Sequence, residues 1–161
     1  MKFIRYIILI FCFTTLLTSQ VSAQGVVRNY ISKYKELATA LSDQYGIPVA
    51  VILGVAIVES SAGKGPAVRN LNNHFGIEGH NTLIAQGKHK SRYKEYECDS
   101  QSYEDFCKLI TRKHFYERIK TKKDPVLWVN AMSKAHYSEI PEAWKKKIIT
   151  AIHAYHLESL D

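Results

Sequence analysis

A long uncharged stretch near the middle of the chain constrains the fold more than any other feature. Every residue from Val49 to Val58 is apolar or glycine, and the first charge after this stretch belongs to Glu59. Pro48 suits the start of a helix, so we predict a helix over residues 49–60. A helix that is apolar on all sides is stable only when other elements surround it. The remaining segments must therefore pack around this one.

Glu59 is the acidic residue at the end of the predicted helix, directly before a turn that contains Gly63. Because the helix is buried, its terminal carboxylate is expected where the core meets a cleft. Desolvation there disfavours the ionised form and raises the pKa of the carboxyl group, as a general acid working near neutral pH requires. The alternative, a helix-end glutamate that simply faces water, stays open because position alone does not separate the two.

Apolar residues recur at helical spacing in four further segments. The spacing predicts helices over residues 29–45, 102–113 and 124–134, and a last helix that begins at Pro141. Ser102 and Asp105 resemble a capping box for the second of these helices. Residues 61–77 have loop composition, and residues 78–94 are predicted to form a small hairpin or extended flap. The expected fold class is mainly α, with five to six helices around a buried central helix and a small extended lobe.

The first residues of the chain have the features of a secretory signal peptide. Lys2 and Arg5 precede an apolar run from Tyr6 to Leu17, and small residues lead up to Ala23. The run is too short to span a bilayer comfortably. We predict cleavage after Ala23, which leaves residues 24–161 as one exported domain without a membrane anchor. Its expected location is the periplasm or the extracellular space.

The charge of the chain limits the classes of partner that we expect, and its cysteine and histidine content bears on disulfides and metal sites. The formal net charge of +7 falls to +5 once Lys2 and Arg5 are removed with the leader, so the domain is attracted to polyanions such as the cell wall. Export and the lack of a recognition motif argue against nucleic acid as a partner.

Cys98 and Cys107 lie too far apart along a mostly helical or extended stretch to form a disulfide, which predicts free thiols. No metal site is expected, because no His or Cys pair has ligand spacing near another.

Four short segments follow one another in a recognisable order. They are Tyr45–Val49, Ala56–Ser60, Asn72–Ile77 and Tyr93–Asp105. In order and spacing the chain resembles the bacterial glucosaminidases of glycoside hydrolase family 73, a lysozyme-superfamily group that includes the flagellar peptidoglycan hydrolase domain. The resemblance runs from about Leu37 to Asp161. It implies an α+β lysozyme-like fold and activity on glycan strands.

The resemblance also implies roles for individual residues. The family's catalytic glutamate corresponds to Glu59, which would protonate the glycosidic oxygen as the sugar bond breaks. Asn73 would fix the catalytic helix or hydrogen-bond the sugar, while Phe75 packs beneath it. Tyr96 belongs to the fourth segment and is taken as a further substrate contact. A purely structural role for Phe75 is the alternative.

Near the C-terminus the chain departs from the family pattern. Tyr137 and Pro141 match the family's Gly-Tyr-Ala-Thr-Asp-Pro-x-Tyr group, but Trp144 stands where the family has its final tyrosine. Trp144 offers an indole ring for stacking on a sugar and no phenol. Any role of that phenol would pass to Tyr137, and both residues are expected in the substrate cleft.

The second catalytic group is unassigned. Glycosidases usually work with two carboxylates, and the region after the Asn72–Ile77 segment offers Glu78, Glu95 and Glu97. Each of them fits an exposed surface charge equally well. Substrate assistance by an N-acetyl group would remove the need for a second acid.

We therefore expect an exported, monomeric hydrolase that cleaves β-1,4 bonds of peptidoglycan glycan strands as an endo-β-N-acetylglucosaminidase, with Glu59 as general acid and no cofactor. A lytic transglycosylase is the nearest enzymatic alternative, since it shares the fold and the single glutamate. A cell-wall-binding module without catalytic activity is the alternative outside the class of enzymes. A host glycan is a further possible substrate.

Overall fold

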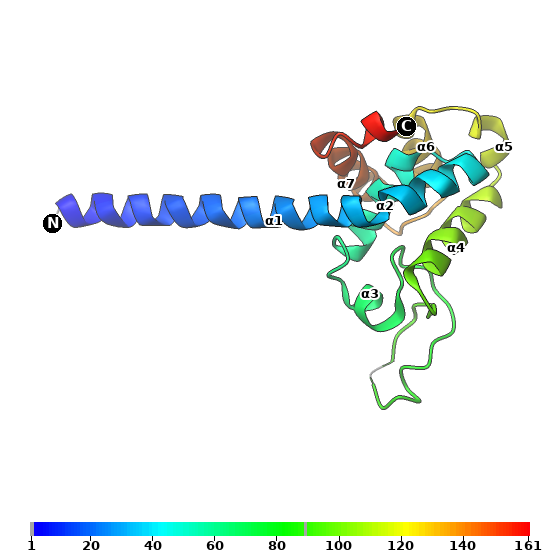
Figure 1. Cartoon of the computed structure of the whole chain (residues 1–161), viewed down its shortest axis with the longest axis horizontal. Helices are drawn as coiled ribbons and strands as arrows, with labels where there is room; N and C mark the ends of the chain where they lie inside the picture. Colours follow the sequence, from blue (N-terminus) through cyan, green and yellow to red (C-terminus); the bar gives the residue numbers. More distant parts are fainter. Residues whose placement is uncertain (1, 89) are drawn as a thin grey trace.

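The computed structural model describes residues 2–88 and 90–161, and the side chains of these residues from residue 24 onward. This part of the chain forms seven α-helices and one short 3-10 helix (Figure 1). They are α1 (Lys2–Tyr45), α2 (Val49–Ser60), α3 (Pro66–Leu71), α4 (Asp99–Thr111), α5 (Tyr116–Ile119), α6 (Pro125–Lys134), α7 (Pro141–Ala154) and η1 (Leu157–Leu160). The predicted mainly α fold is confirmed. No helix of the described residues has the length and apolar content that crossing a membrane requires.

Helix α1 begins well before the helix predicted over residues 29–45. It is continuous from Lys2 to Tyr45, and its C-terminal half packs against α2 and α4. Tyr30, Tyr34 and Leu41 are buried there. The leader is predicted over residues 1–23, and the side chains of these residues lie outside the part that the structure describes. Cleavage after Ala23 therefore stays a prediction.

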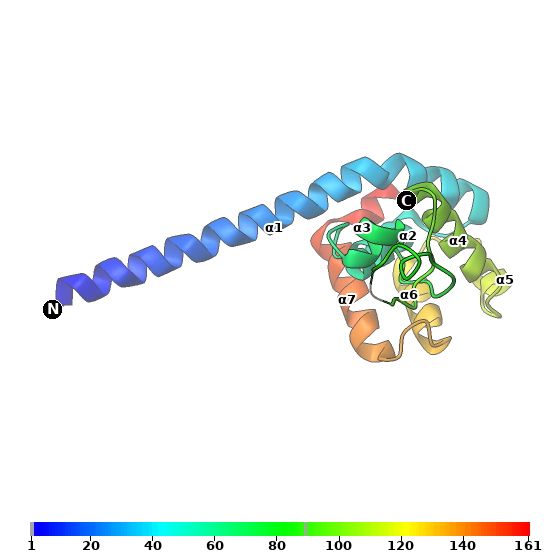
Figure 2. The same ribbon diagram turned by 90° about the horizontal axis from the view of Figure 1, so that it is seen from below.

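Helix α2 is the centre of the molecule, as its apolar sequence predicts. Residues 49–57 are all buried, and α2 contacts α1, α6, α7 and η1 (Figure 2). Gly54 permits a close approach to α7, because a Cβ there would lie 2.8 Å from Ile152 Cγ1. Side chains from several elements therefore enclose α2 along nearly its whole length.

Helix α6 also has the predicted bounds, and its start has a clear physical cause. The Asp124 carboxylate accepts hydrogen bonds from the backbone N–H groups of Val126 and Leu127, at 2.9 and 3.2 Å. Pro125 occupies the first turn, where its missing N–H costs nothing. The two signals act together, which is why the sequence located this helix correctly.

Two predictions about the central segments are wrong. The stretch over residues 61–77 contains the short helix α3, which its loop-like composition concealed. Helix α4 begins at Asp99, three residues before Ser102, so Ser102 and Asp105 form no capping box. Both side chains bind other segments instead: Ser102 Oγ accepts from the backbone N–H of His74 at 3.0 Å, and Asp105 accepts from Lys94 and Tyr96.

The segment between α3 and α4 is an extended flap with a single antiparallel bridge, between Glu78 and Tyr93. The backbone N–H of Gly79 donates to Arg92 O at 2.9 Å, and that of Lys94 donates to Ile77 O at 2.8 Å. The structure thus agrees with the predicted extended lobe. Its pairing is short, so the flap depends on side-chain contacts to the helical body.

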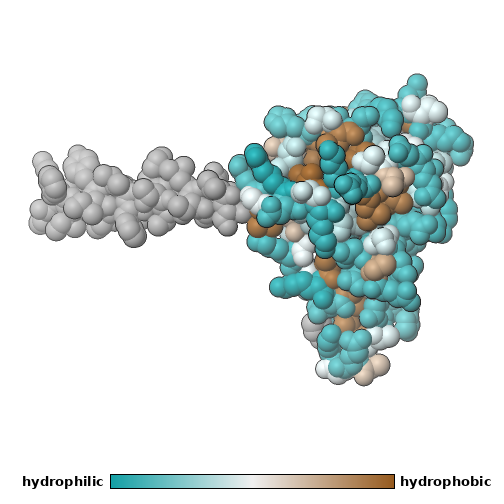
Figure 3. Space-filling model, viewed as in Figure 1, coloured by the Kyte–Doolittle hydropathy of each residue, from teal (hydrophilic) through white to brown (hydrophobic). Residues whose placement is uncertain are grey.

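The molecular surface in the view of Figure 3 is mostly hydrophilic, with small hydrophobic patches. Cys98 is an exposed free thiol, whereas Cys107 is a free thiol buried in the core. Burial raises the pKa of the Cys107 thiol to about 12, so this group stays protonated and behaves as a small apolar side chain.

Candidate active site

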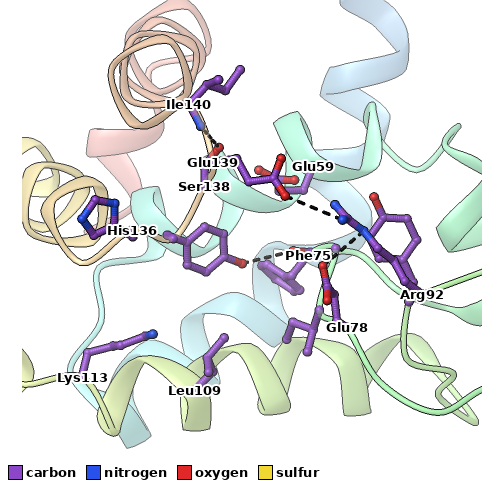
Figure 4. Close-up of a pocket in the computed structure, with 14 residues that line it drawn as sticks. Glu59, Phe75, Glu78, Arg92, Leu109, Lys113, His136, Ser138, Glu139 and Ile140 are labelled. Atoms are coloured by element: carbon purple, nitrogen blue, oxygen red, sulfur yellow. Dashed lines mark hydrogen bonds and ion pairs between the residues drawn. The ribbon is translucent and has the colours of Figure 1, made fainter.

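A cleft of about 550 Å³ lies where the C-terminal end of α2 meets the extended flap and the loop between α6 and α7. Helix α2 contributes Glu59 to its lining, and Figure 4 shows the surrounding side chains. The other lining residues come from the loop after α3, the flap, the C-terminal end of α4 and the α6–α7 loop: Phe75, Gly76, Ile77, Glu78, Arg92, Tyr93, Leu109, Lys113, His136, Tyr137, Ser138, Glu139 and Ile140.

The two carboxylate oxygens of Glu59 have different surroundings. Oε1 accepts a hydrogen bond from the indole N–H of Trp144 on α7 at 2.6 Å. Oε2 lies toward Gly76, where a Cβ would come within 3.4 Å of it. Gly76 has a φ of +66° and no side chain, so the loop passes close to Oε2 without covering it. One oxygen is thus anchored by the helical body, and the other faces the cleft.

The environment raises the pKa of Glu59. Burial is the main cause, and it outweighs the Trp144 hydrogen bond and the charge of Lys147, both of which favour the carboxylate form. This is the direction expected from a carboxyl group at the end of an apolar helix. A group with a raised pKa retains a proton at a higher pH than an exposed glutamate and can donate it to a substrate.

A tight turn after α2 fixes the position of Glu59. Ser61, Ala62 and Gly63 all have positive φ values, which reverses the chain within one turn. Ser60 is buried beside them, and its hydroxyl donates to Ala56 O at 2.6 Å while accepting from the Gly63 N–H at 2.9 Å. The turn satisfies backbone groups that a helix end would otherwise leave unpaired.

Asn73 organises the cleft floor. Its side chain is buried, and the amide nitrogen donates to Ile77 O and Lys94 O, both at 2.8 Å. The amide oxygen accepts from the backbone N–H groups of Phe75 and Ile77, at 3.3 and 3.2 Å. All four hydrogen-bonding positions of the amide are filled, which leaves none for a sugar.

Phe75 lies beneath the cleft, as the resemblance implies. Its ring stacks on Phe106 of α4 with centroids 4.2 Å apart, and it meets the edge of Tyr103 at 4.9 Å. The side chain is 2 % exposed. Aromatic packing of this kind holds the loop against α4, so the ring supports the floor from below.

Tyr137 and Trp144 lie side by side behind Glu59. Their ring centroids are 5.2 Å apart, and the Tyr137 hydroxyl donates to Phe75 O at 3.1 Å. Burial, with the nearby charge of Glu59, raises the pKa of Tyr137 well above its ordinary value. Trp144 is only 4 % exposed and does not line the cleft. Its N–H therefore holds the acid, and its ring has no face open for stacking on a sugar.

Tyr96 lies outside the cleft. It is buried, and its hydroxyl donates to Asp105 Oδ2 at 2.8 Å. The same carboxylate oxygen accepts from Lys94 Nζ at 2.7 Å. These contacts tie the end of the flap to α4, so Tyr96 supports the lobe that borders the cleft.

Two further carboxylates line the cleft, and both pair with Arg92. Glu78 Oε1 lies 3.2 Å from Arg92 Nε, and Glu139 Oε1 lies 3.7 Å from a terminal guanidinium nitrogen (Figure 4). The Arg92–Glu78 pair lies within the flap, and the Arg92–Glu139 pair connects the flap to the α6–α7 loop across the cleft. Sequence reasoning named Glu78 but missed Arg92 and Glu139, because no local pattern marks either of them. Glu95 binds Thr82 and Glu97 binds Gln101, and neither glutamate lines the cleft.

Comparison with solved structures places the fold. The chain is 20% identical to the catalytic domain of the autolysin Auto from Listeria monocytogenes, with a TM-score of 0.68, covering 91% of this chain and 97% of that one. It is 21% identical to the glycoside hydrolase domain of FlgJ from Salmonella typhimurium, with a TM-score of 0.65 and coverage of 83% and 90%. A chain in a type VI secretion effector–immunity complex from Pseudomonas protegens matches at 23% identity and a TM-score of 0.58, with coverage of 80% and 92%.

The fold is thus the lysozyme-like fold of glycoside hydrolase domains. The protein belongs to the glucosaminidase family, described as mannosyl-glycoprotein endo-beta-N-acetylglucosaminidase, which matches residues 35–157. It is a glycoside hydrolase domain. No curated protein matches its sequence at a significant level.

Proposed function

We propose that this protein is an exported peptidoglycan hydrolase that cleaves β-1,4 bonds of glycan strands after N-acetylglucosamine, with Glu59 as the general acid. One observation supports this proposal above the others. Glu59 is a partly buried carboxyl group with one oxygen anchored by Trp144 and the other facing a cleft. In a glycoside hydrolase domain, that is the arrangement of a proton donor.

The hydrogen bond from Trp144 supports a proton on the other carboxyl oxygen of Glu59. Because Oε1 accepts from the indole N–H, we place the acidic proton on Oε2, which faces Gly76 and the cleft. A glycosidic oxygen bound there receives this proton as its bond to the anomeric carbon breaks. Glu59 is left as a carboxylate that the Trp144 N–H stabilises, and water adds to the anomeric carbon with loss of one proton, which returns to Glu59 or passes to solvent.

The choice of peptidoglycan has two supports. Two of the matched solved structures belong to an autolysin and to a FlgJ glycoside hydrolase domain, and a net charge of +5 on residues 24–161 draws the domain to an anionic wall. Export rests on the signal-like residues 1–23. A cell-wall substrate requires that location, so the two parts of the proposal agree.

A lytic transglycosylase is the second candidate. In that reaction the substrate's own hydroxyl group closes a 1,6-anhydro ring, and one acid–base group is sufficient. The observation in its favour is that Glu78 and Glu139, the other carboxylates lining the cleft, are both held in ion pairs with Arg92.

A zymogram on purified sacculi with residues 24–161 and its Glu59→Gln variant tests the proposal. We expect clearing by the unaltered protein and none by the variant. Clearing by both would reject Glu59 as the acid, and clearing by neither would leave a wall-binding module. Mass spectrometry of the soluble products then separates the two reactions: new reducing N-acetylglucosamine ends indicate the hydrolase, and 1,6-anhydro-muramyl ends indicate the transglycosylase.

A further inference from the structure

The two sides of the cleft differ in how their charges are matched. In the view of Figure 4, Arg92 lies on one side and Lys113 and His136 lie on the other, with Glu59 between them. Arg92 is paired with two carboxylates. Lys113 and His136 also line the cleft, yet within the described residues neither side chain takes part in an ion pair or hydrogen bond. The second side therefore presents a cation and a ring N–H to whatever occupies the cleft.

Lys113 is placed by the end of α4. It follows the C-cap of that helix, and its backbone N–H donates to Ile110 O at 3.0 Å. The side chain is only partly exposed, because it extends along the cleft wall beside Leu109. Partial burial of its stem holds the ammonium group near the cleft, where water screens its charge less than on an open surface.

The backbone of His136 is unusual for a residue with a side chain. It directly follows the C-cap of α6 and has a φ of +52°. Glycine is the residue that best suits this position, because any Cβ is strained there. His156 has the same φ at the corresponding position after α7, so the backbone alone gives the imidazole no special role. What distinguishes His136 is that its exposed side chain lines the cleft that contains Glu59.

We infer that Lys113 and His136 form a subsite for a carboxylate carried by the muramyl residue of the glycan strand. The inference rests on the proposed function, since it takes the occupant to be peptidoglycan. The sugar rings of such a strand are neutral, and their negative charge lies on the lactyl group or on the stem peptide attached to it. An ammonium group and an N–H donor on one wall match a carboxylate at the side of a strand that threads the cleft.

Chemical neutralisation of the substrate tests this subsite. Sacculi are compared before and after their carboxylates are converted to amides with a carbodiimide and ammonia. We expect Lys113→Gln to lower kcat/KM about five-fold on native sacculi, the factor of a partly screened ion pair, and to change nothing on amidated sacculi. Lys122→Gln removes an exposed lysine outside the cleft and serves as the control for net charge. Equal losses for Lys113→Gln on both substrates, or equal losses for both variants, would overturn the inference.

His136→Gly separates binding from folding. The substitution relieves the strained backbone, so the thermal midpoint should stay the same or rise while activity on native sacculi falls. Unchanged activity would remove His136 from the subsite. Strands stripped by an amidase, which keep only the lactyl carboxylate, identify the source: a Lys113→Gln effect that persists indicates the lactyl group, and one that disappears indicates the stem peptide.

A binding assay keeps this inference separate from the proposed function. Sedimentation with sacculi is measured for Glu59→Gln and for the double variant with Lys113→Gln. Weaker binding of the double variant to native but not amidated sacculi supports the subsite even if the unaltered protein releases no product. Identical binding of the two proteins to native sacculi rejects it, whatever the catalytic result.

Discussion

The indole N–H of Trp144 donates to Glu59 Oε1 at 2.6 Å, a contact between residues 85 positions apart in the sequence. It anchors α7 to the end of α2 at the carboxyl group proposed to do the chemistry. The hydrogen bond favours the carboxylate form of Glu59, while burial opposes it. The proton affinity of Glu59 is therefore set by two opposing influences, burial and the Trp144 hydrogen bond. The hydrogen bond can be removed by substitution of Trp144.

Trp144→Phe should shift that balance. Without the N–H donor the pKa of Glu59 rises further, so the alkaline limb of the pH–rate profile moves to higher pH. The maximal rate should fall roughly ten-fold, because Oε1 loses the donor that stabilises its charge after proton transfer. Trp128→Phe is the matched control, since the N–H of Trp128 donates to Lys122 O away from the cleft. An unmoved alkaline limb in Trp144→Phe would contradict this account.

Glu59→Gln should remove activity and add stability. Loss of a general acid typically costs 10²- to 10⁴-fold in rate, which we expect here as a minimum. The pKa of Glu59 is raised by folding, so the folded protein binds this proton more tightly than the unfolded chain. Stability from this group is therefore present at low pH and is lost as pH rises through the folded pKa.

Urea unfolding of Glu59→Gln across pH measures that effect. The neutral variant lacks the titration, so it should exceed the unaltered protein in stability near pH 7 and approach it near pH 4. A variant that is less stable than the unaltered protein at pH 7 would show that burial does not destabilise the ionised carboxylate of Glu59.

Asn73→Ala should act on the fold before it acts on the substrate. The change leaves partly buried backbone groups of the cleft floor without partners, including Ile77 N–H and Lys94 O, at a cost of about 2–4 kcal/mol in unfolding free energy. Asn81→Ala is the control within the flap, where the amide donates to Ser91 O and Tyr93 O at a more exposed site. If Asn73→Ala kept full stability and lost only activity, a direct sugar contact would be favoured.

The stretch of α1 from residue 24 to residue 34 should be essential although the family match begins at residue 35. The Tyr30 hydroxyl bonds His74 Nδ1 at 2.6 Å, and Tyr34 donates to Asp99 at 2.6 Å. His74 in turn lies 3.0 Å from Asp99. A protein that begins at residue 35 loses both buried tyrosines and should unfold at least about 3 kcal/mol more easily than residues 24–161.

Tyr30→Phe tests the hydrogen bond alone in the same unfolding assay. It should cost about 1–2 kcal/mol, because the His74 ring is left with an unpaired nitrogen. Equal stability of the shortened and the full domain would mean that this buried network contributes nothing.

Glu78→Gln and Glu139→Gln compare the two cleft carboxylates. If one of them activates water, its replacement should lower the hydrolytic rate by about 10²-fold or more, while the other variant changes it little. Each variant removes one ion pair of Arg92, so each is the control of the other for the loss of an ion pair. Small losses in both would favour assistance by the substrate's N-acetyl group. Product analysis of each variant completes the measurement.

The sequence predicted those parts that local chemistry specifies. The bounds of α2 follow from its unbroken apolar run, and those of α6 from Asp124 and Pro125. The start of α4 was misplaced because Ser102 and Asp105 look like a local cap, yet they bond to His74 and to the flap. Nothing in a local window distinguishes the two uses of a short polar side chain.

The candidate site also combines residues that the local sequence indicates with residues that only the tertiary structure brings together. The end of the apolar helix pointed to Glu59, but Arg92 and Glu139 meet only because the flap and the α6–α7 loop fold toward each other. Trp144 stands at the position of the family's final tyrosine, which predicts a ring in the cleft that stacks on a sugar. Its burial against Tyr137 depends on how α7 packs, which periodicity does not reveal.

The saturated amide of Asn73 also bears on how such a domain can diversify. A buried amide whose four hydrogen-bonding positions are filled tolerates little change, whereas the two walls that carry Arg92 and Glu139 are joined through an exposed ion pair. Mutational drift, or a protein engineer, can vary those two walls to accept a different polysaccharide. Glu59, the proposed proton donor, would be inherited unchanged.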